Sequence, residues 1–519
     1  MLTQNKDLLR NAGSLAATTG LTSIFGFTFW IYAARVFPQQ AVGYASAANS
    51  TMYLLATIGM FGLGTMLIGE LPQRKSRAGL LMAALIASFV ASLILGVGFA
   101  VVALAFGNHF VEIAGSFGRM AIFSFGTAIT ACTYVFDDST IGLMRGGLQL
   151  TRNTVFSIAK MALLPACGLV LHDMFGVGIT LAWVLGTFVS LVPVIIMIKR
   201  DGTRILHRPD WKAFRRLGKV TLAHNWLNLA VITPPKVIPV LVVLVVSPSD
   251  NAAFYMASML TGFLTMVPTH LSTVLFAVAS AAPEKIGEKL RFVLRTSLVV
   301  GIPGGLVMGL ASHLLLSIFG SGYASAGTGP LWLLIIGYIP EVPNTVYIAV
   351  CRASGRMNQA AIFLSAAAAV QMVAVLVGGK LDGLYGVCFG MLAVAFAEAL
   401  VTTPPILRAA FGSAPARSAA DEARTPQPTP AMAATTGLRL RQEAGVAALV
   451  SLASTMTGAQ PALSRSRARH RLAAMTDTRA DRAVTDTSWW PDADEQSFRA
   501  RQEAGVAALI AIATHGARL

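Results

Sequence analysis

A small set of charged residues lies inside or near the ends of long apolar stretches, where ionised side chains are costly. They are Asp137, Asp138, Lys160, Lys236, Glu341 and Glu398. A charged side chain at the centre of a bilayer costs about 2.5 to 3.5 kcal/mol on insertion scales, so such residues mark a cavity or pathway by default. Lysines there would bind an anionic group, and carboxylates would bind a proton or a cation.

Lys236 is the strongest candidate because Pro234, Pro235 and Pro239 surround it. Each proline removes a backbone N–H donor, and irregular helix at membrane depth requires cover by protein or contact with water. We therefore favour a cationic lining for an anionic headgroup over a lysine that snorkels from a kinked helix. Three polar residues at the start of the same stretch complete this set of substrate-binding candidates. They are His224, Asn225 and Asn228.

Two further cations are candidates for the same lining. Lys160 shares a helix face with Asn153 and Ser157, at steps of three and four, which predicts a polar stripe turned inward. Arg35 ends an apolar stretch at the predicted outer surface. Each residue could line a cavity or have an ordinary structural role. The structural alternative is snorkelling for Lys160 and anchoring at the membrane interface for Arg35.

The carboxylates are candidates for ion coupling or for a gate. Glu341 stands between Pro340 and Pro343, where it would either titrate or stay protonated and hydrogen-bonded. Asp137, Asp138 and Glu398 lie nearer the predicted inner end. An inner gate or a salt bridge to Arg145 explains these three residues as well as transport chemistry does.

No residue is assigned a catalytic role, and we expect the protein not to be an enzyme. GxxxxGK[ST], HExxH and GxSxG patterns are absent from the sequence, which argues against an ATPase, a zincin and a hydrolase. The four cysteines lack metal-ligand spacing, so we expect neither a metal site nor a cofactor.

Membrane helices must position these residues. Of the 519 residues, 55% are hydrophobic and only 12% charged, with a mean hydropathy of +0.65, whereas soluble domains carry about 25% charge. The net charge of +16 comes mainly from residues between apolar stretches, so nucleic acid is not an expected partner. Twelve segments reach the roughly 20 residues that one crossing needs. They are approximately 14–34, 42–68, 79–106, 119–143, 153–171, 175–198, 220–246, 252–278, 296–319, 329–350, 360–378 and 383–407.

Lys and Arg are concentrated in every second connection between predicted spans, and connections rich in Lys and Arg stay on the cytoplasmic side. With both termini inside, the outer connections hold only Arg35, Arg119 and Lys380. The sequence also indicates an internal duplication, because Pro38, Tyr44 and Ala47 match Pro248, Phe254 and Ala257 at an offset of 210. We therefore predict an all-α polytopic membrane protein with two six-helix lobes related as parallel repeats. The predicted parts are lobe 1–198, basic cytoplasmic linker 199–219, lobe 220–408 and tail 409–519.

The tail is rich in Ala, Arg, Thr and Pro and contains RQEAGVAAL twice, at 441 and 501. Such a tract buries too little apolar area to offset its ordering entropy, so we expect it to be disordered or partly helical. A short surface helix or low-complexity duplication is favoured over a partner-binding module.

Four segments carry a resemblance to a known family. They are AARVFPQQAVGYASAANSTMYLLATIGMFGLGT (33–65), HNWLNLAVITPPKVIPVLVV (224–243), AAFYMASMLTGFLTMVPTHLSTVLFA (252–277) and FGSGYASAG (319–327). Over roughly 8–408 the chain resembles bacterial polysaccharide exporters of the O-antigen and teichoic acid type, in the multidrug/oligosaccharidyl-lipid/polysaccharide flippase superfamily. It departs from the family at FAVASAAP (276–283), which lacks the acidic residue expected after the phenylalanine.

This resemblance implies a MATE-like fold in the bacterial cytoplasmic membrane, with a central cavity and alternating access. It also implies transport of a polyprenyl-pyrophosphate-linked glycan to the outer leaflet, with Arg35, Lys160 and Lys236 as the positions able to contact pyrophosphate. Membrane lipids and a polysaccharide polymerase or glycosyltransferases would be partners. Two alternatives are a cation-coupled multidrug exporter on the same fold and a non-transporting scaffold for envelope glycan assembly. A multidrug exporter would favour acidic residues in the cavity of the N-terminal lobe, and the first two spans have none before Glu70, at the inner end of the second span.

Overall fold

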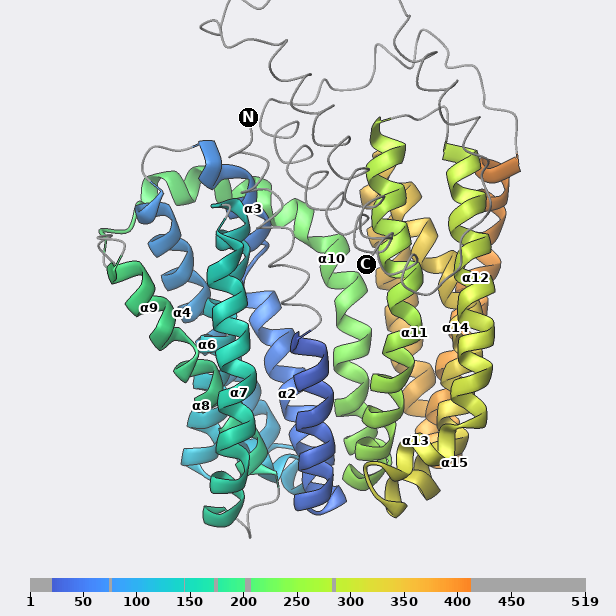
Figure 1. Cartoon of the computed structure of the whole chain (residues 1–519), viewed down its shortest axis with the longest axis horizontal. Helices are drawn as coiled ribbons and strands as arrows, with labels where there is room; N and C mark the ends of the chain where they lie inside the picture. Colours follow the sequence, from blue (N-terminus) through green and yellow to red (C-terminus); the bar gives the residue numbers. More distant parts are fainter. Residues whose placement is uncertain are drawn as a thin grey trace, which may run out of the picture. The chain divides into compact units, whose positions relative to one another are not determined.

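The computed structural model describes residues 21–73, 77–143, 145–171, 176–200, 207–281 and 286–411. All of them belong to one compact unit, Asn11–Glu443. Within these ranges the chain forms helices joined by short connections, and no strand occurs there (Figure 1). The predicted tail beyond Phe411 and the first residues of the first predicted span lie outside the described residues.

Helices of the N-terminal half precede the predicted linker. They are Leu21–Val36, α2 Gln39–Gly59, α3 Leu63–Glu70, α4 Ala78–Leu104, α5 Val111–Ala114, α6 Phe117–Gly142, α7 Gly146–Val170, α8 Val177–Val189 and α9 Leu191–Arg200, with short 3-10 turns η1 Leu71–Gln73 and η2 Gly107–Phe110. The C-terminal half consists of α10 Trp211–Val245, α11 Pro248–Ala281, α12 Ile286–Leu310, α13 Ser312–Ser317, α14 Ser321–Ala353 and α15 Met357–Phe411.

Nine helices in the described ranges are long and apolar enough to cross a membrane. The pair α2 and α3, bent by 52°, adds one crossing, and α15 contains two helices that meet at Asp382 and Gly383. The shorter apolar helix Leu21–Val36 corresponds to the first predicted span. Together these helices account for all twelve predicted segments, and the prediction of an all-helical, multi-pass membrane protein is confirmed.

Several helices are longer than their predicted spans. Residues 211–219, predicted to lie in a loop, form the first turns of α10, and α12 begins at Ile286 rather than near 296. The side chain of Asp210 caps α10 by accepting a hydrogen bond from the Ala213 backbone N–H at 2.9 Å. Hydropathy detects only the part of a helix that lies in hydrocarbon, so polar first turns escape it.

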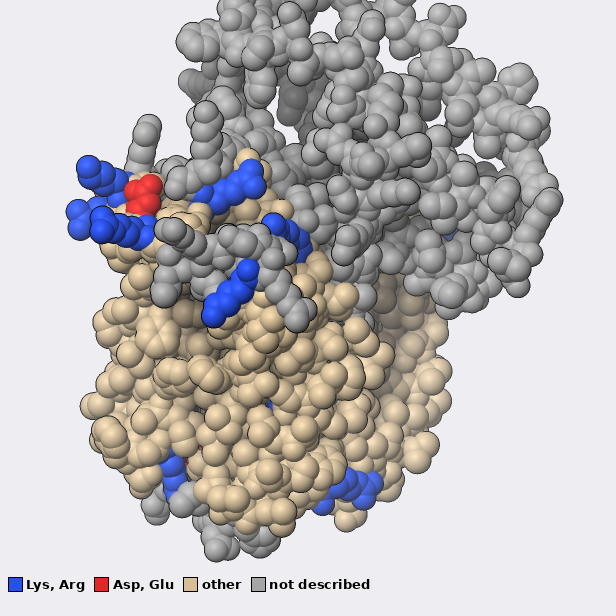
Figure 2. All heavy atoms as spheres, turned by 60° about the vertical axis from the view of Figure 1, so that its left-hand side comes forward, with Lys and Arg blue, Asp and Glu red and all other residues tan. Residues whose placement is uncertain are grey.

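Charge is distributed as a membrane protein requires. Figure 2 shows Lys and Arg mainly at one end of the face in view, separated by a broad uncharged band from smaller patches at the opposite end. Many large apolar side chains of the long helices are exposed, including Ile94, Val101 and Phe188. In water such a surface would be unfavourable, but in lipid it is the expected exterior.

The two halves meet along α2, which contacts α10 and α11 (Figure 1). Gly43 of α2 lies directly against the backbone of Pro248 at the start of α11, with no room for a side chain. Buried Asn251 donates hydrogen bonds to the Gly43 carbonyl at 2.7 Å and to the Ser46 hydroxyl at 3.0 Å. Small residues and interhelical hydrogen bonds are the usual means of holding membrane helices together.

Candidate functional site

Lys160 of α7 lies inside the N-terminal half and is only 3% exposed. Its Nζ stands over three aromatic rings, 4.2 Å from the centre of Trp183, 4.6 Å from Phe156 and 4.9 Å from Phe29. These rings come from α8, α7 and the helix Leu21–Val36, respectively. An ammonium group over a desolvated ring is attracted by about 2 kcal/mol or more, so the aromatic cage offsets part of the cost of burying the charge.

Close packing of α8 holds Lys160 in this cage. Gly186 of α8 faces the Lys160 backbone, and a methyl group on Gly186 would lie 2.9 Å from the Lys160 Cβ and 3.0 Å from its backbone nitrogen. The glycine therefore allows α7 and α8 to approach closely enough for Trp183 to reach the ammonium group. Ser157, one turn earlier on the same face as Lys160, is also buried.

Lys236 of α10 is half-buried and faces the N-terminal half. Its Nζ lies 4.4 Å from the centre of the Tyr53 ring on α2, and Tyr53 packs edge-on against Tyr134 of α6 at 5.2 Å. Although α10 contains three prolines, it continues as one helix from Trp211 to Val245. The lysine therefore lies at the contact between the two halves rather than in a broken segment.

Neither lysine has an anionic partner within the described residues. Lys160 and Lys236 make the ring contacts given above, and among those residues no hydrogen bond or ion pair involves either of them. Aromatic rings reduce the cost of a buried cation but do not neutralise its charge. Both positions can therefore bind an anion without first breaking a salt bridge.

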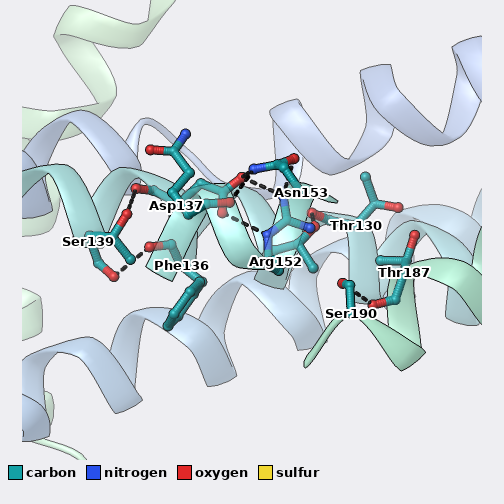
Figure 3. A network of polar contacts seen from close by, with 11 residues as sticks. Thr130, Phe136, Asp137, Ser139, Arg152, Asn153, Thr187 and Ser190 are labelled. Atoms are coloured by element: carbon teal, nitrogen blue, oxygen red, sulfur yellow. Dashed lines mark hydrogen bonds and ion pairs between the residues drawn. The ribbon is translucent and has the colours of Figure 1, made fainter. Parts of the chain in front are cut away.

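An ion pair connects α6 and α7 near the predicted inner end (Figure 3). Arg152 binds Asp137 in a two-pronged contact, in which Nε donates to Oδ1 at 2.7 Å and Nη2 donates to Oδ2. Asn153 donates to the same Oδ2 at 3.2 Å and accepts from Arg152 at 2.8 Å. Asp137 thus pairs with Arg152, which lies inside α7 on the face turned to α6, and the predicted salt bridge to Arg145 stays a prediction.

The carboxylates of the C-terminal half form a second polar group. Thr345 donates to Glu341 at 3.2 Å, and Asn344 donates to Glu398 at 3.1 Å. Thr402 donates to the Asn344 side-chain oxygen at 2.8 Å, which fixes the orientation of that amide. Glu341 lies within electrostatic range of Glu398, so α14 and α15 bring the two candidate carboxylates together.

Other predicted residues lie apart from the lysines. Arg35 is exposed and donates to the carbonyls of Ser317 and Ile318, both at 2.8 Å, at the end of α13. Asn228 accepts a hydrogen bond from Arg352 at 3.1 Å, and Asp138 lies against Gly64 of α3. The side chains of His224 and Asn225 lie outside the described residues. In the described part of the chain, no group of three or more His, Cys, Asp or Glu residues could hold a metal ion.

The aromatic cage escaped the sequence analysis. Phe29, Phe156 and Trp183 lie in three different apolar stretches, where aromatic residues are ordinary core residues. The one available signal was the spacing of Phe156, which stands four residues before Lys160 and so shares its helix face, and the sequence analysis did not use it. The contacts of Phe29 and Trp183 depend on how the helices pack, which spacing along one helix does not reveal.

Comparison with known proteins places the fold among transporters. No protein-family profile and no curated protein matches the chain. It is similar to an inward-facing multidrug resistance MATE family transporter of the MOP superfamily, at 16% identity and a TM-score of 0.54 over 76% of this chain and 96% of that one. It is also similar to the lipid II flippase MurJ in an inward closed conformation, at 13% identity and a TM-score of 0.55, over 84% of this chain and 98% of that one.

A third similar structure is the Vibrio cholerae MATE transporter VcmN, in a mutant form, at 16% identity and a TM-score of 0.51 over 79% of this chain and 99% of that one. At these identities the similarity establishes the fold. The chain has the MATE-like and MurJ-like fold of MOP-superfamily transporters.

Proposed function

We propose that the protein is a flippase in a bacterial cytoplasmic membrane, with both termini inside, that moves a polyprenyl-pyrophosphate-linked glycan from the inner to the outer leaflet. The observation that carries this proposal is the pair of membrane-depth lysines without a carboxylate partner in the described residues. A pyrophosphate that leaves water needs cations to replace part of its hydration, and Lys binds phosphate as a compact point charge.

The contact between the halves supports a mechanism of alternating access. Near the predicted outer end, Arg35, Gln39 and Asn251 each donate a hydrogen bond to the opposite half. Lys236 faces Tyr53 across the same boundary, farther along α2 from its outer end. We infer that a headgroup binds beside Lys236 while the outer contacts are closed and leaves when they separate.

Substitution of Lys236 tests this function. We expect Lys236→Met to reduce glycan export at least tenfold, because the residue keeps its length but loses its charge, and Lys236→Arg to retain more export than Lys236→Met. Export would be measured in cells as lipid-linked glycan on the outer leaflet, with protein level in the membrane checked in parallel. Lys380→Met is the matched control, since Lys380 is exposed at the predicted outer surface, just before the break in α15 at Asp382 and Gly383.

Export and efflux assays on variants of the chain separate the competing functions. Full export by well-expressed Lys236→Met would contradict the role of Lys236 in binding the headgroup. Efflux of cationic drugs that disappears in Glu341→Gln or Glu398→Gln, with glycan export unaffected, would instead favour a cation-coupled multidrug exporter. Deletion of 411–519 separates a transporter from a scaffold: a transporter core should still move lipid-linked sugar, whereas failure of the shortened, well-expressed chain would favour a non-transporting scaffold that acts through its tail.

A further inference from the structure

Glu112 of α5 is a buried carboxylate that the proposed transport path does not use. It is 5% exposed, and it lies in the connection between α4 and α6, at the predicted outer end. Thr180 of α8 donates a hydrogen bond to its Oε1, whereas its Oε2 has no hydrogen-bond partner among the described residues. A buried carboxylate oxygen without a donor is costly when the group is ionised.

A small cavity lies beside this carboxylate. Its volume is about 10 Å³, and it is lined by Glu112, Thr180, Arg119, Ala48 and neighbouring apolar side chains. That volume is about the minimum for one water molecule. The carboxylate therefore lies beside a small, mainly apolar space that has room for one water molecule, through which a proton could be exchanged.

The charged groups around Glu112 are few. Arg119 of α6 favours the ionised form, α4 and α8 contain no ionisable side chain, and α2 brings Tyr44 at this end. The side chain of His109 in η2 lies outside the described residues. Burial nevertheless dominates, and it raises the pKa of Glu112 from 4.5 to about 8, against the opposing effects of the Thr180 hydrogen bond and the Arg119 charge.

The surroundings connect Glu112 to the contact between the halves. Gly176, which precedes α8, has a φ of +80°, and a methyl group there would lie 3.1 Å from the Glu112 Oε2 and 2.5 Å from the Ala41 carbonyl oxygen of α2. The start of α8 is thus wedged between the carboxylate and α2. The next residues of α2, Gly43 and Ser46, accept the hydrogen bonds of Asn251 from the opposite half.

We propose that Glu112 is a proton-binding site at the predicted outer end, and that its loss of the proton loosens the contact of α5 with α8 and α2. The closed arrangement holds a proton that an opened, hydrated carboxyl would release between pH 4.5 and about 8. By linkage, opening becomes easier as the pH rises through this range and changes no further above it. The effect on export rests on the proposed flippase function, whereas proton binding does not.

Infrared titration of the purified full chain in detergent tests the proton site. We expect the wild-type protein to show, at neutral pH, a component of the protonated-carboxyl absorption that disappears with a midpoint near 8 and that Glu112→Gln removes. The difference spectrum between the wild type and Glu112→Gln separates this band from any absorption of Glu341, Glu398 and Asp137. Thr180→Val should move the midpoint upward, because it removes a hydrogen bond that favours the ionised form. Glu288→Gln, which removes an exposed glutamate of α12, is the control and should leave the band unchanged.

Two results would overturn the site: a wild-type protein without this band at neutral pH, or a band that Glu112→Gln and Thr180→Val both leave unaltered. Hydrogen exchange, corrected for its intrinsic pH dependence, tests the coupling. Residues 111–117 should lose protection as the pH rises to about 8 in the wild type and not in Glu112→Gln. Equal loss in both proteins would overturn the coupling. No glycan is needed, so these outcomes are independent of the Lys236 export assay.

Discussion

The Asp137–Arg152 pair and the two lysines show how single residues handle charge in a membrane helix bundle. Asp137 and Arg152 neutralise each other through two hydrogen bonds, and Asn153 occupies a remaining acceptor position. Lys160 and Lys236 instead contact aromatic rings. Because the charges of Asp137 and Arg152 neutralise each other, we assign this pair a structural role. Because the two lysines have no anionic partner among the described residues, we assign them to substrate binding.

Breaking the ion pair should destabilise the fold. We expect Arg152→Ala to lower the free energy of unfolding by about 3 to 5 kcal/mol, because it leaves the Asp137 charge buried and uncompensated. Arg152→Met combined with Asp137→Asn should cost less than Arg152→Ala alone. Thermal denaturation in detergent would measure both, with Arg356→Ala, at an exposed position, as the control. If the double variant is no more stable than the single one, the pair is not the stabilising element.

Residue roles were only partly predictable from the sequence. Helical spacing placed Lys160 and Ser157 on one face, since that pattern depends on a single helix. The pairing of Asp137 with Arg152 depends on how α6 and α7 pack against each other, and a charge count gives no information about it. Glu112 was missed because it stands in a connection between spans, where a charged residue is ordinarily solvated.

At the scale of the helices, glycines at the contacts decide how closely neighbouring helices approach. Gly186 brings α8 against α7, and Gly378 and Gly386 bring the two parts of α15 together beyond the break at Gly383. Hydropathy located these helices because their length in hydrocarbon is fixed by the bilayer. It did not locate the contacts, since a glycine contributes equally to the average whether it faces lipid or another helix.

Adding one methyl group at such a contact should be harmful. We expect Gly186→Ala to destabilise the protein by about 1 to 3 kcal/mol, as overpacking does, because the new Cβ would press on the Lys160 backbone. Gly98→Ala is the matched control: it lies in α4 with nothing within 4 Å, so better helix propensity should make it neutral or stabilising. Melting temperatures of both variants in the same detergent decide the question, and equal effects would contradict the packing argument.

At the scale of the whole chain, the outer contact between the halves is the feature that the proposed transport cycle would have to open. Gly43 and Asn251 form its buried centre, and Arg35 and Gln39 lie at its edge. The internal duplication indicated by the sequence places Pro38 and Pro248 in equivalent positions, just before α2 and at the start of α11. The repeat thus suggested which helices correspond, although the predicted lobe boundaries stay a prediction.

A bulky residue at this contact should hold it open. In Gly43→Leu the new side chain would meet the Pro248 backbone, so we expect Asn49→Cys, on buried Asn49 of α2, to react several-fold faster with an impermeant maleimide added from outside. The Gly43→Leu background without Asn49→Cys corrects for the native cysteines. Gly98→Leu, at a site with free space, should leave the rate unchanged. Unaltered labelling in Gly43→Leu would mean that this contact does not control access.

The connection between the halves has a mechanical consequence. The Asp210 backbone N–H donates to the Gly79 carbonyl of α4 at 3.0 Å, and Phe214 packs on the core of the N-terminal half. Farther along the same helix, Leu227 belongs to a core cluster of the C-terminal half. The connection is therefore a continuous helix that packs on both halves. A rotation of one half against the other would bend or tilt α10, and the Lys236 ammonium group would move with that helix.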